Sequence, residues 1–152
     1  MKKLLICLLA LMMLTVGCCA VAEDKPLAGK TLKIAMSPDF MYFETISETD
    51  PTGYEGLDID IIKSLSEKLG FDFEIVPMSF SSLIGSLQTG NADFVISGMS
   101  YTEERAQVVD FSMTYVTTDV GCVVPVDSTI ASYDDLKGQV VCCSQGTTYE
   151  ML

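Results

Sequence analysis

Apolar and polar positions in the middle of the chain alternate between the period of a strand and the period of a helix. Thr31–Met36 and Phe71–Val76 alternate residue by residue, as half-buried strands do. Phe94–Ile96 is a short apolar run with the length and β-branched content of a buried strand. Between these runs, Gly56–Leu69 and Ser79–Leu87 carry apolar residues at helical spacing. This order predicts an α/β fold on a parallel sheet with right-handed crossovers.

The first predicted helix has recognisable ends. Gly70 follows it, where a helix C-terminus favours a left-handed residue. Asp58 and Asp60 suit its first turn through the helix dipole, and a paired-carboxylate active site is the less favoured interpretation. The inward faces of the two helices are predicted to contain Ile61, Ile62, Leu65 and Leu69 in the first and Leu83, Ile84 and Leu87 in the second.

Four further segments follow the third strand. Tyr115–Val124 is long and rich in β-forming residues, which predicts another strand. Ile130–Leu136 predicts a turn or short helix, Gln139–Cys143 a strand, and Gln145–Thr148 the start of a helix.

The first 22 residues have the pattern of an export signal. Two lysines precede an apolar run, Leu4–Val16, and small residues follow it. The run is shorter than the roughly 20 residues needed to span a membrane. Thr15–Cys18 resembles a lipoprotein box, which predicts lipidation of Cys18 and a membrane anchor. Ordinary cleavage near Ala20 or Ala22 is the alternative, and residues 23–30 are interpreted as a linker.

The segment Asn91–Asp110 is the centre of the predicted chemistry. The strand ends in small and polar residues, and Ser100 and Glu103 have the spacing of a capping box for a following helix. Just inside that helix lies Arg105, the single arginine of the chain. A strand end and a helix start expose backbone N–H groups, and a guanidinium matches a carboxylate through two parallel hydrogen bonds. The segment therefore predicts an anion site, with a surface ion pair of Arg105 as the alternative.

Charge and composition narrow the function classes. The formal net charge is −12 and there is no histidine. We therefore expect no nucleic-acid partner, because its backbone demands a basic surface, and no histidine-based catalysis or metal binding. The cysteines beyond the leader region are Cys122, Cys142 and Cys143, an odd number. We expect Cys142 and Cys143 to be small buried apolar residues, with no mandatory disulfide and no structural metal.

Several segments together resemble the extracellular solute-binding proteins (family 3) of amino-acid ABC transporters, which have the periplasmic binding protein type II fold. The segments are Ser97–Ser100, Thr102–Arg105, Val109–Ser112 and the helix opening Gly56–Ile61. The resemblance implies that Arg105 clamps the α-carboxylate of the ligand. It also implies that the ligand-binding residues are Ser37, Phe40, Gly98, Met99, Ser100, Arg105, Thr147 and Thr148. Phe40 would lie over the ligand, and Ser37 stands where relatives often carry an acidic residue.

The resemblance also implies an architecture and a role. Residues 31–120 would form a complete or nearly complete lobe one, and 121–152 the crossover and the start of a truncated lobe two. The expected protein is a monomeric, non-catalytic receptor without a cofactor, which captures a free amino acid and presents it to an ABC permease. One alternative is a dehydratase-like enzyme acting on carboxylated rings through Asp39 or Glu44. The other is a sensory ligand-binding domain.

Overall fold

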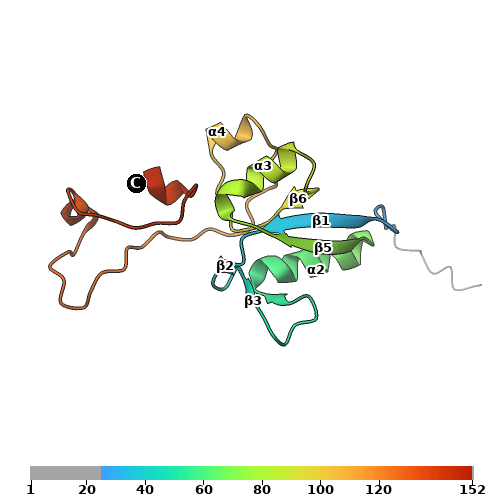
Figure 1. Cartoon of the computed structure of the whole chain (residues 1–152), viewed down its shortest axis with the longest axis horizontal. Coiled ribbons are helices and arrows are strands. Elements are labelled where there is room, and N and C mark those ends of the chain that lie inside the picture. Colours follow the sequence, from blue (N-terminus) through green and yellow to red (C-terminus); the bar gives the residue numbers. More distant parts are fainter. Residues whose placement is uncertain (1–24, 152) are drawn as a thin grey trace, which may run out of the picture.

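The computed structural model describes residues 25–151, and its centre is a three-stranded parallel sheet (Figure 1). β1 (Thr31–Met36) lies between β5 (Asp72–Pro77) and β6 (Phe94–Val95). The register pairs Thr31 with Asp72 and Ile34 with Phe94. The predicted parallel sheet is confirmed. β1 does not keep its expected alternation, however, because its last three residues are all buried, as in a central strand covered on both faces.

Helices cover the two faces of this sheet, with α2 on one side and α3 and α4 on the other in Figure 1. Their bounds are α2 Leu57–Leu69, α3 Leu83–Gln88 and α4 Glu103–Ala106, with a 3₁₀ turn η1 (Phe80–Ser82) before α3. The core on the α2 side contains Ile34, Met36, Ile59, Ile62, Phe71 and Ile96. The core on the α3 side contains Ala35, Leu83 and Ala92. The predicted first helix is confirmed to within a residue, and Gly70 ends it with a φ of 81°.

One residue predicted to lie on the inner face of α2 is exposed. Leu65 has a relative exposure of 37%, whereas Ile59 and Ile62 are fully buried. Ile59, which the pattern did not assign to the inner face, is buried instead, and the fully buried residues of α2 all lie in its N-terminal half.

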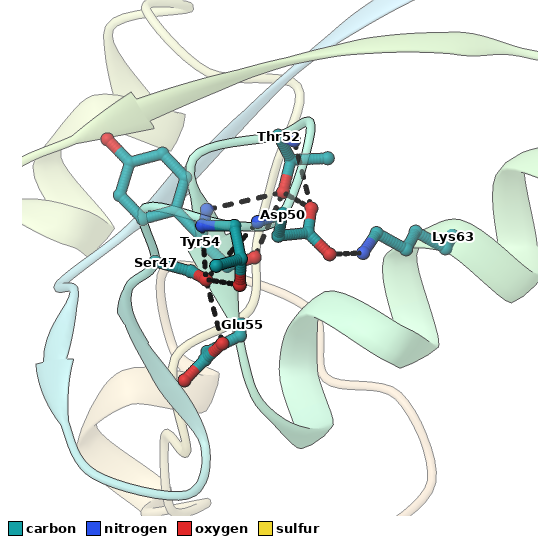
Figure 2. Close-up of polar contacts among 7 residues, drawn as sticks. Ser47, Asp50, Thr52, Tyr54, Glu55 and Lys63 are labelled. Atoms are coloured by element: carbon teal, nitrogen blue, oxygen red, sulfur yellow. Dashed lines mark hydrogen bonds and ion pairs between the residues drawn. The ribbon is translucent and has the colours of Figure 1, made fainter.

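A second, antiparallel sheet was not predicted. It joins β2 (Asp39–Phe40), β3 (Glu44–Ile46) and β4 (Tyr54–Glu55), which are too short to show a period. A polar network closes its loop (Figure 2): the Ser47 hydroxyl donates to Glu55 at 2.7 Å, and the Thr52 hydroxyl donates to Asp50 at 2.6 Å. Lys63 of α2 forms an ion pair with Asp50 and so ties this loop to the helix.

The chain beyond residue 111 has little regular structure. It contains the 3₁₀ turns η2 (Tyr133–Leu136) and η3 (Thr148–Met151). The predicted turn or short helix within Ile130–Leu136 is thus confirmed. The strands predicted at Tyr115–Val124 and Gln139–Cys143 are wrong for this structure, since both segments are irregular. A β-rich segment becomes a strand only against a partner strand, and these two find none within residues 25–151.

The prediction that Cys142 and Cys143 are buried is also wrong. Cys122, Cys142 and Cys143 are exposed, and none of them forms a disulfide within the described residues. Because residues 139–143 are not built into a sheet, Cys142 and Cys143 have no interior to enter.

The export signal and Cys18 lie outside the described residues. Part of the linker belongs to the fold, because the Leu27 N–H donates to the Leu69 carbonyl at 3.0 Å.

Candidate functional site

Arg105 occupies an unusual place for a charged side chain. It sits in the four-residue helix α4, whose N-cap is Thr102, with the Thr102 hydroxyl accepting the Arg105 N–H at 3.1 Å. The capping box predicted from Ser100 is therefore wrong: Thr102 lies directly before the helix, and Ser100 lies two residues too early. Ser100 instead contacts the arginine side chain, because its backbone carbonyl accepts a hydrogen bond from Arg105 Nη1 at 2.6 Å.

The guanidinium of Arg105 is buried without an anionic partner. The residue is only 9% exposed. Its second terminal nitrogen, Nη2, donates to the carbonyl of Gly146 at 2.7 Å, and its Cζ lies 5.6 Å from the centre of the Phe80 ring. Within residues 25–151 the ion pairs are Lys63–Asp50 and Lys137–Asp134, and neither includes Arg105. Burial lowers the pKa of Arg105 from its ordinary value, and the nearby charge of Glu104 opposes this.

A cavity of about 80 Å³ opens in front of this guanidinium. It is smaller than the roughly 300–1,000 Å³ of ordinary small-molecule sites, so the walls supplied by residues 25–151 enclose only part of such a ligand. Its lining includes most of the residues that the sequence singled out, namely Ser37, Phe40, Gly98, Ser100, Arg105, Thr147 and Thr148, together with Asp39, Glu44, Phe80, Ser144 and Tyr149.

The first wall of the cavity is the carboxyl end of β1 and the turn after it. Ser37 is buried, and its hydroxyl donates to Asp39 at 2.9 Å. Phe40 stacks on Phe43, with ring centres 4.4 Å apart and planes inclined by 10°, which fixes the aromatic face of the wall. Placing this turn at the carboxyl edge of a parallel strand is what the sequence predicted.

The second wall is the bend after β6. Gly98 has a φ of +53°, and a Cβ at this position would lie 2.7 Å from the Phe40 ring. A side chain is therefore excluded here by both backbone conformation and space. Met99 lines a neighbouring hollow of about 300 Å³, which also includes Phe43 and residues 111–118 and shares Phe40, Gly98, Ser100 and Tyr149 with the Arg105 cavity.

The third wall comes from the end of the chain. Thr147 is buried and its hydroxyl donates to the carbonyl of Ser144 at 2.7 Å, so that the hydroxyl stabilises its own turn. Thr148 is half-buried at the start of η3. Gly146 lies against η1, because a Cβ added to it would be 3.1 Å from Ser81. This segment reaches the Arg105 cavity although the residues before it are exposed.

Two fully buried carboxyl groups adjoin the first and second walls, and one of them, Glu44, is part of the cavity lining. Glu44 of β3 accepts a hydrogen bond from the Ser97 hydroxyl, and Asp58 of α2 accepts from the Gly98 N–H at 2.8 Å. Burial is the main reason why the pKa of Glu44 rises from 4.5 to about 9. The Ser97 hydrogen bond opposes this rise, and neighbouring Asp58 and Asp39 add to it. The expectation that Asp58 acts through the helix terminus is incomplete, since Asp58 reaches across to β6.

Phe80 was not predicted as a site residue. Its ring lies in the cavity wall beside Arg105, but its position in a Ser-rich turn carried no periodic pattern. No group of three or more His, Cys, Asp or Glu side chains suited to a metal ion occurs in residues 25–151. In the same part of the chain, no helix is both long and apolar enough to cross a membrane.

Comparison with known proteins identifies the family. Residues 32–145 match the family described as bacterial extracellular solute-binding proteins, family 3. The chain belongs to this family. Over 152 residues it is 36% identical to the arginine-binding extracellular protein ArtP of Bacillus subtilis, in a match that covers 99% of the chain. The chain spans 58% of the length of that relative.

Solved structures give the fold. The arginine-bound form of truncated ArgBP from T. maritima is 42% identical with a TM-score of 0.53, over 57% of this chain and 40% of that one. An ancestral amino acid-binding protein, described as a precursor of cyclohexadienyl dehydratase, is 40% identical with a TM-score of 0.52, over 57% and 37%. The solute-binding family 3 chain described here is thus an α/β protein of the type II periplasmic binding fold, and it covers less than half of these two neighbours.

Proposed function

We propose that this chain carries the carboxylate-binding lobe of an amino-acid-binding component of an ABC importer. The observation that carries the proposal is Arg105, a buried guanidinium at a cavity with no carboxylate paired to it among the described residues. A buried cation without a partner is costly, and a ligand carboxylate would offset that cost through two charge-assisted hydrogen bonds.

The remaining walls have roles that follow from their chemistry. Phe40 and Phe80 would cover the apolar part of the ligand, and the bend at Gly98 and Ser100 brings main-chain groups close to the carboxylate. Thr147 and Thr148 would contact the ligand from the far side of the cavity. Since Arg105 Nη2 already donates to Gly146, the ligand would bind beside this carbonyl or displace it.

The ligand in this proposal is a free amino acid, and arginine is the first to test because relatives carry it in their names. Delivery to a membrane permease and the absence of catalysis are part of the same proposal. The protein would act outside the cell membrane, as the family description states for its members.

A dehydratase-like enzyme is the second candidate, favoured by one observation. Glu44 lines the cavity and has a pKa raised to about 9 by burial, and a raised pKa is a property of general acids. Against this role, the Glu44 side chain is fully buried and one of its carboxyl oxygens already accepts from Ser97. Incubation with a carboxylated ring alcohol, followed for loss of water, tests the candidate directly.

Arg105→Lys tests the receptor proposal. Lysine keeps the charge but loses the forked geometry, and the expected loss is roughly 2–5 kcal/mol, as for breaking a buried charge pair. Because the chain spans part of its relatives, we expect millimolar binding, about −4 kcal/mol, and the variant should show none. Amide NMR titration with L-arginine measures this.

Lys137→Gln is the matched control, since Lys137 is an exposed cation paired with Asp134 outside the cavity. It should titrate like the unmodified chain. Equal affinity of the Arg105→Lys variant and the control would return Arg105 to a structural role.

A further inference from the structure

Glu44 and Asp58 are buried carboxyl groups beside the cavity whose hydrogen-bonding capacity is only partly satisfied. Both residues are 0% exposed, and each has one carboxyl oxygen with a partner and one without. The oxygens without a partner are Glu44 Oε2 and Asp58 Oδ1. The two residues are neighbours in space, because the Asp58 N–H donates to the carbonyl of Phe43 at 2.9 Å, and the consecutive residues Ser97 and Gly98 donate to Glu44 and to Asp58. Two buried carboxylates side by side, with no cation paired to either within residues 25–151, would repel each other strongly.

The geometry points to one proton shared by Glu44 and Asp58, and to this acid pair as the element that positions the bend Ser97–Gly98 at the ligand cavity. A proton between Glu44 Oε2 and Asp58 Oδ1 gives both orphaned oxygens a partner and removes one of the two charges. The inference rests on the proposed function in so far as the positioned bend serves ligand binding.

The surroundings decide which residue holds the proton. Asp58 lies in the first turn of α2, where the helix dipole favours a negative charge, and it accepts the Gly98 N–H. Tyr115 contacts Asp58 as well, and its own pKa is raised, first by burial and then by the Asp58 charge. Burial disfavours the charged form of Glu44 and raises its pKa, and the nearby Asp58 and Asp39 add to this, so that Glu44 would hold the proton and donate it to Asp58.

The acid pair connects three elements to the site. Glu44 belongs to β3, Asp58 to α2, and Ser97 follows β6. The Ser97 hydroxyl donates to Glu44 and accepts the Ser37 N–H at 3.0 Å. Through these bonds the pair fixes Ser37 and Gly98, which line the cavity together with Glu44. Glu44 is therefore a positioning residue.

The proton is visible without any ligand. Carbon-13 NMR of the whole chain, labelled at the glutamate carboxyl carbons, should show one glutamate in the protonated form at pH 7. Glu44→Gln should remove that signal, and Glu74→Gln, which changes an exposed glutamate of β5, should leave it. A spectrum at pH 7 in which every glutamate carboxyl is ionised overturns the shared proton.

Positioning is tested by hydrogen exchange at Gly98. Glu44→Gln keeps an N–H donor for Asp58 and should leave the Gly98 amide protected within about twofold of the unmodified chain. Ser97→Ala removes the hydroxyl between Ser37 and Glu44 but leaves both carboxyls, and should lower protection of Ser37 and Gly98 by about tenfold, as for the loss of one buried hydrogen bond. Unchanged protection in Ser97→Ala overturns the positioning role.

Ligand binding by Arg105 and the shared proton can be tested independently. If every variant, Arg105→Lys included, still bound L-arginine, this would contradict the proposed function and leave the carbon-13 result intact. A missing acid signal in a chain whose binding does depend on Arg105 would overturn the acid pair alone.

Discussion

At the scale of single residues, the site combines one unpaired buried cation with one excess buried proton. Within residues 25–151 Arg105 has no carboxylate paired to it, whereas burial, with Asp58 and Asp39 nearby, raises the pKa of Glu44 so that it holds a proton. Both follow from the cost of burying charge without compensation. They differ in exposure: Arg105 is 9% exposed and lines the cavity with free hydrogen-bonding capacity, whereas Glu44, in the same lining, is 0% exposed.

Glu44 makes stability depend on pH in a defined window. The folded chain holds the proton up to a pKa of about 9, while an unfolded glutamate releases it near 4.5. The folded state therefore binds more protons between these values, and stability should fall as pH rises, by about 1.4 kcal/mol per pH unit at most. Urea unfolding from pH 5 to pH 9 should show this slope, and Glu44→Gln should flatten it.

The other carboxyl groups whose pKa is shifted have a lowered pKa, so they do not titrate between pH 5 and pH 9. The pKa of Asp50 is lowered to about 2, first by the hydrogen bond from Lys63, so its contribution is present above pH 4 and is lost only as pH falls toward 2. Hydrogen bonds from Ala131 and Ser132 also lower the pKa of Asp135. An unchanged slope in Glu44→Gln would therefore contradict a protonated Glu44.

At the scale of elements, α2 carries the largest share of the core beside β1. Ile62→Ala should cost about 2–5 kcal/mol, because the site is fully buried and closely packed. Leu65→Ala on the same helix is the control, and it should cost less than about 1 kcal/mol, because Leu65 is 37% exposed. Denaturant midpoints measure both, and equal costs would support the inward Leu65 that the periodicity suggested.

Elements with a strong period were predictable from the sequence, and those that depend on partners were not. α2 shows helical spacing and a terminal glycine, and β1 and β5 are long enough to show their pattern. The antiparallel sheet has strands of two or three residues, in which no period can appear. Gln139–Cys143 has a strand composition, yet strand formation depends on a neighbouring strand that its own residues do not supply.

The residues of the candidate site also divide into those that local sequence predicts and those that depend on distant partners. Arg105 and the bend at Gly98 were visible as a motif after a strand, since local chemistry defines them. Phe80 and the contact between Glu44 and Asp58 depend on how distant segments pack, and Asp58 looked like an ordinary residue of a helix start. The choice of Thr102 as N-cap was open because two hydroxyl residues stand close to the helix.

At the scale of the whole molecule, order is uneven along the chain. Residues 93–97 join the central sheet and both cores, whereas residues 140–143 are exposed and make no backbone hydrogen bond to another segment. Hydrogen exchange should therefore be slow in 93–97 and fast in 139–143, since exchange follows local stability. Equal protection of the two segments would show that the C-terminal part is built into a stable sheet.

Anchoring is a separate prediction at this scale. If Cys18 is lipidated, the mature protein should partition into detergent, and Cys18→Ala should release it into the soluble fraction. Cys19→Ala is the neighbouring control and should leave partitioning unchanged. A mature N-terminus sequenced beyond Cys19 would contradict lipidation at this position.

The central claim is that Arg105 binds a ligand carboxylate, and a pair of ligands tests it most directly. L-arginine and L-argininamide share a side chain and an α-amino group, but the amide lacks the carboxylate. In amide NMR titrations of the 152-residue chain, L-arginine should shift the resonances of Gly98, Ser100 and Arg105 in the millimolar range, and L-argininamide should not. Equal shifts from both ligands, or none from L-arginine, would contradict the claim.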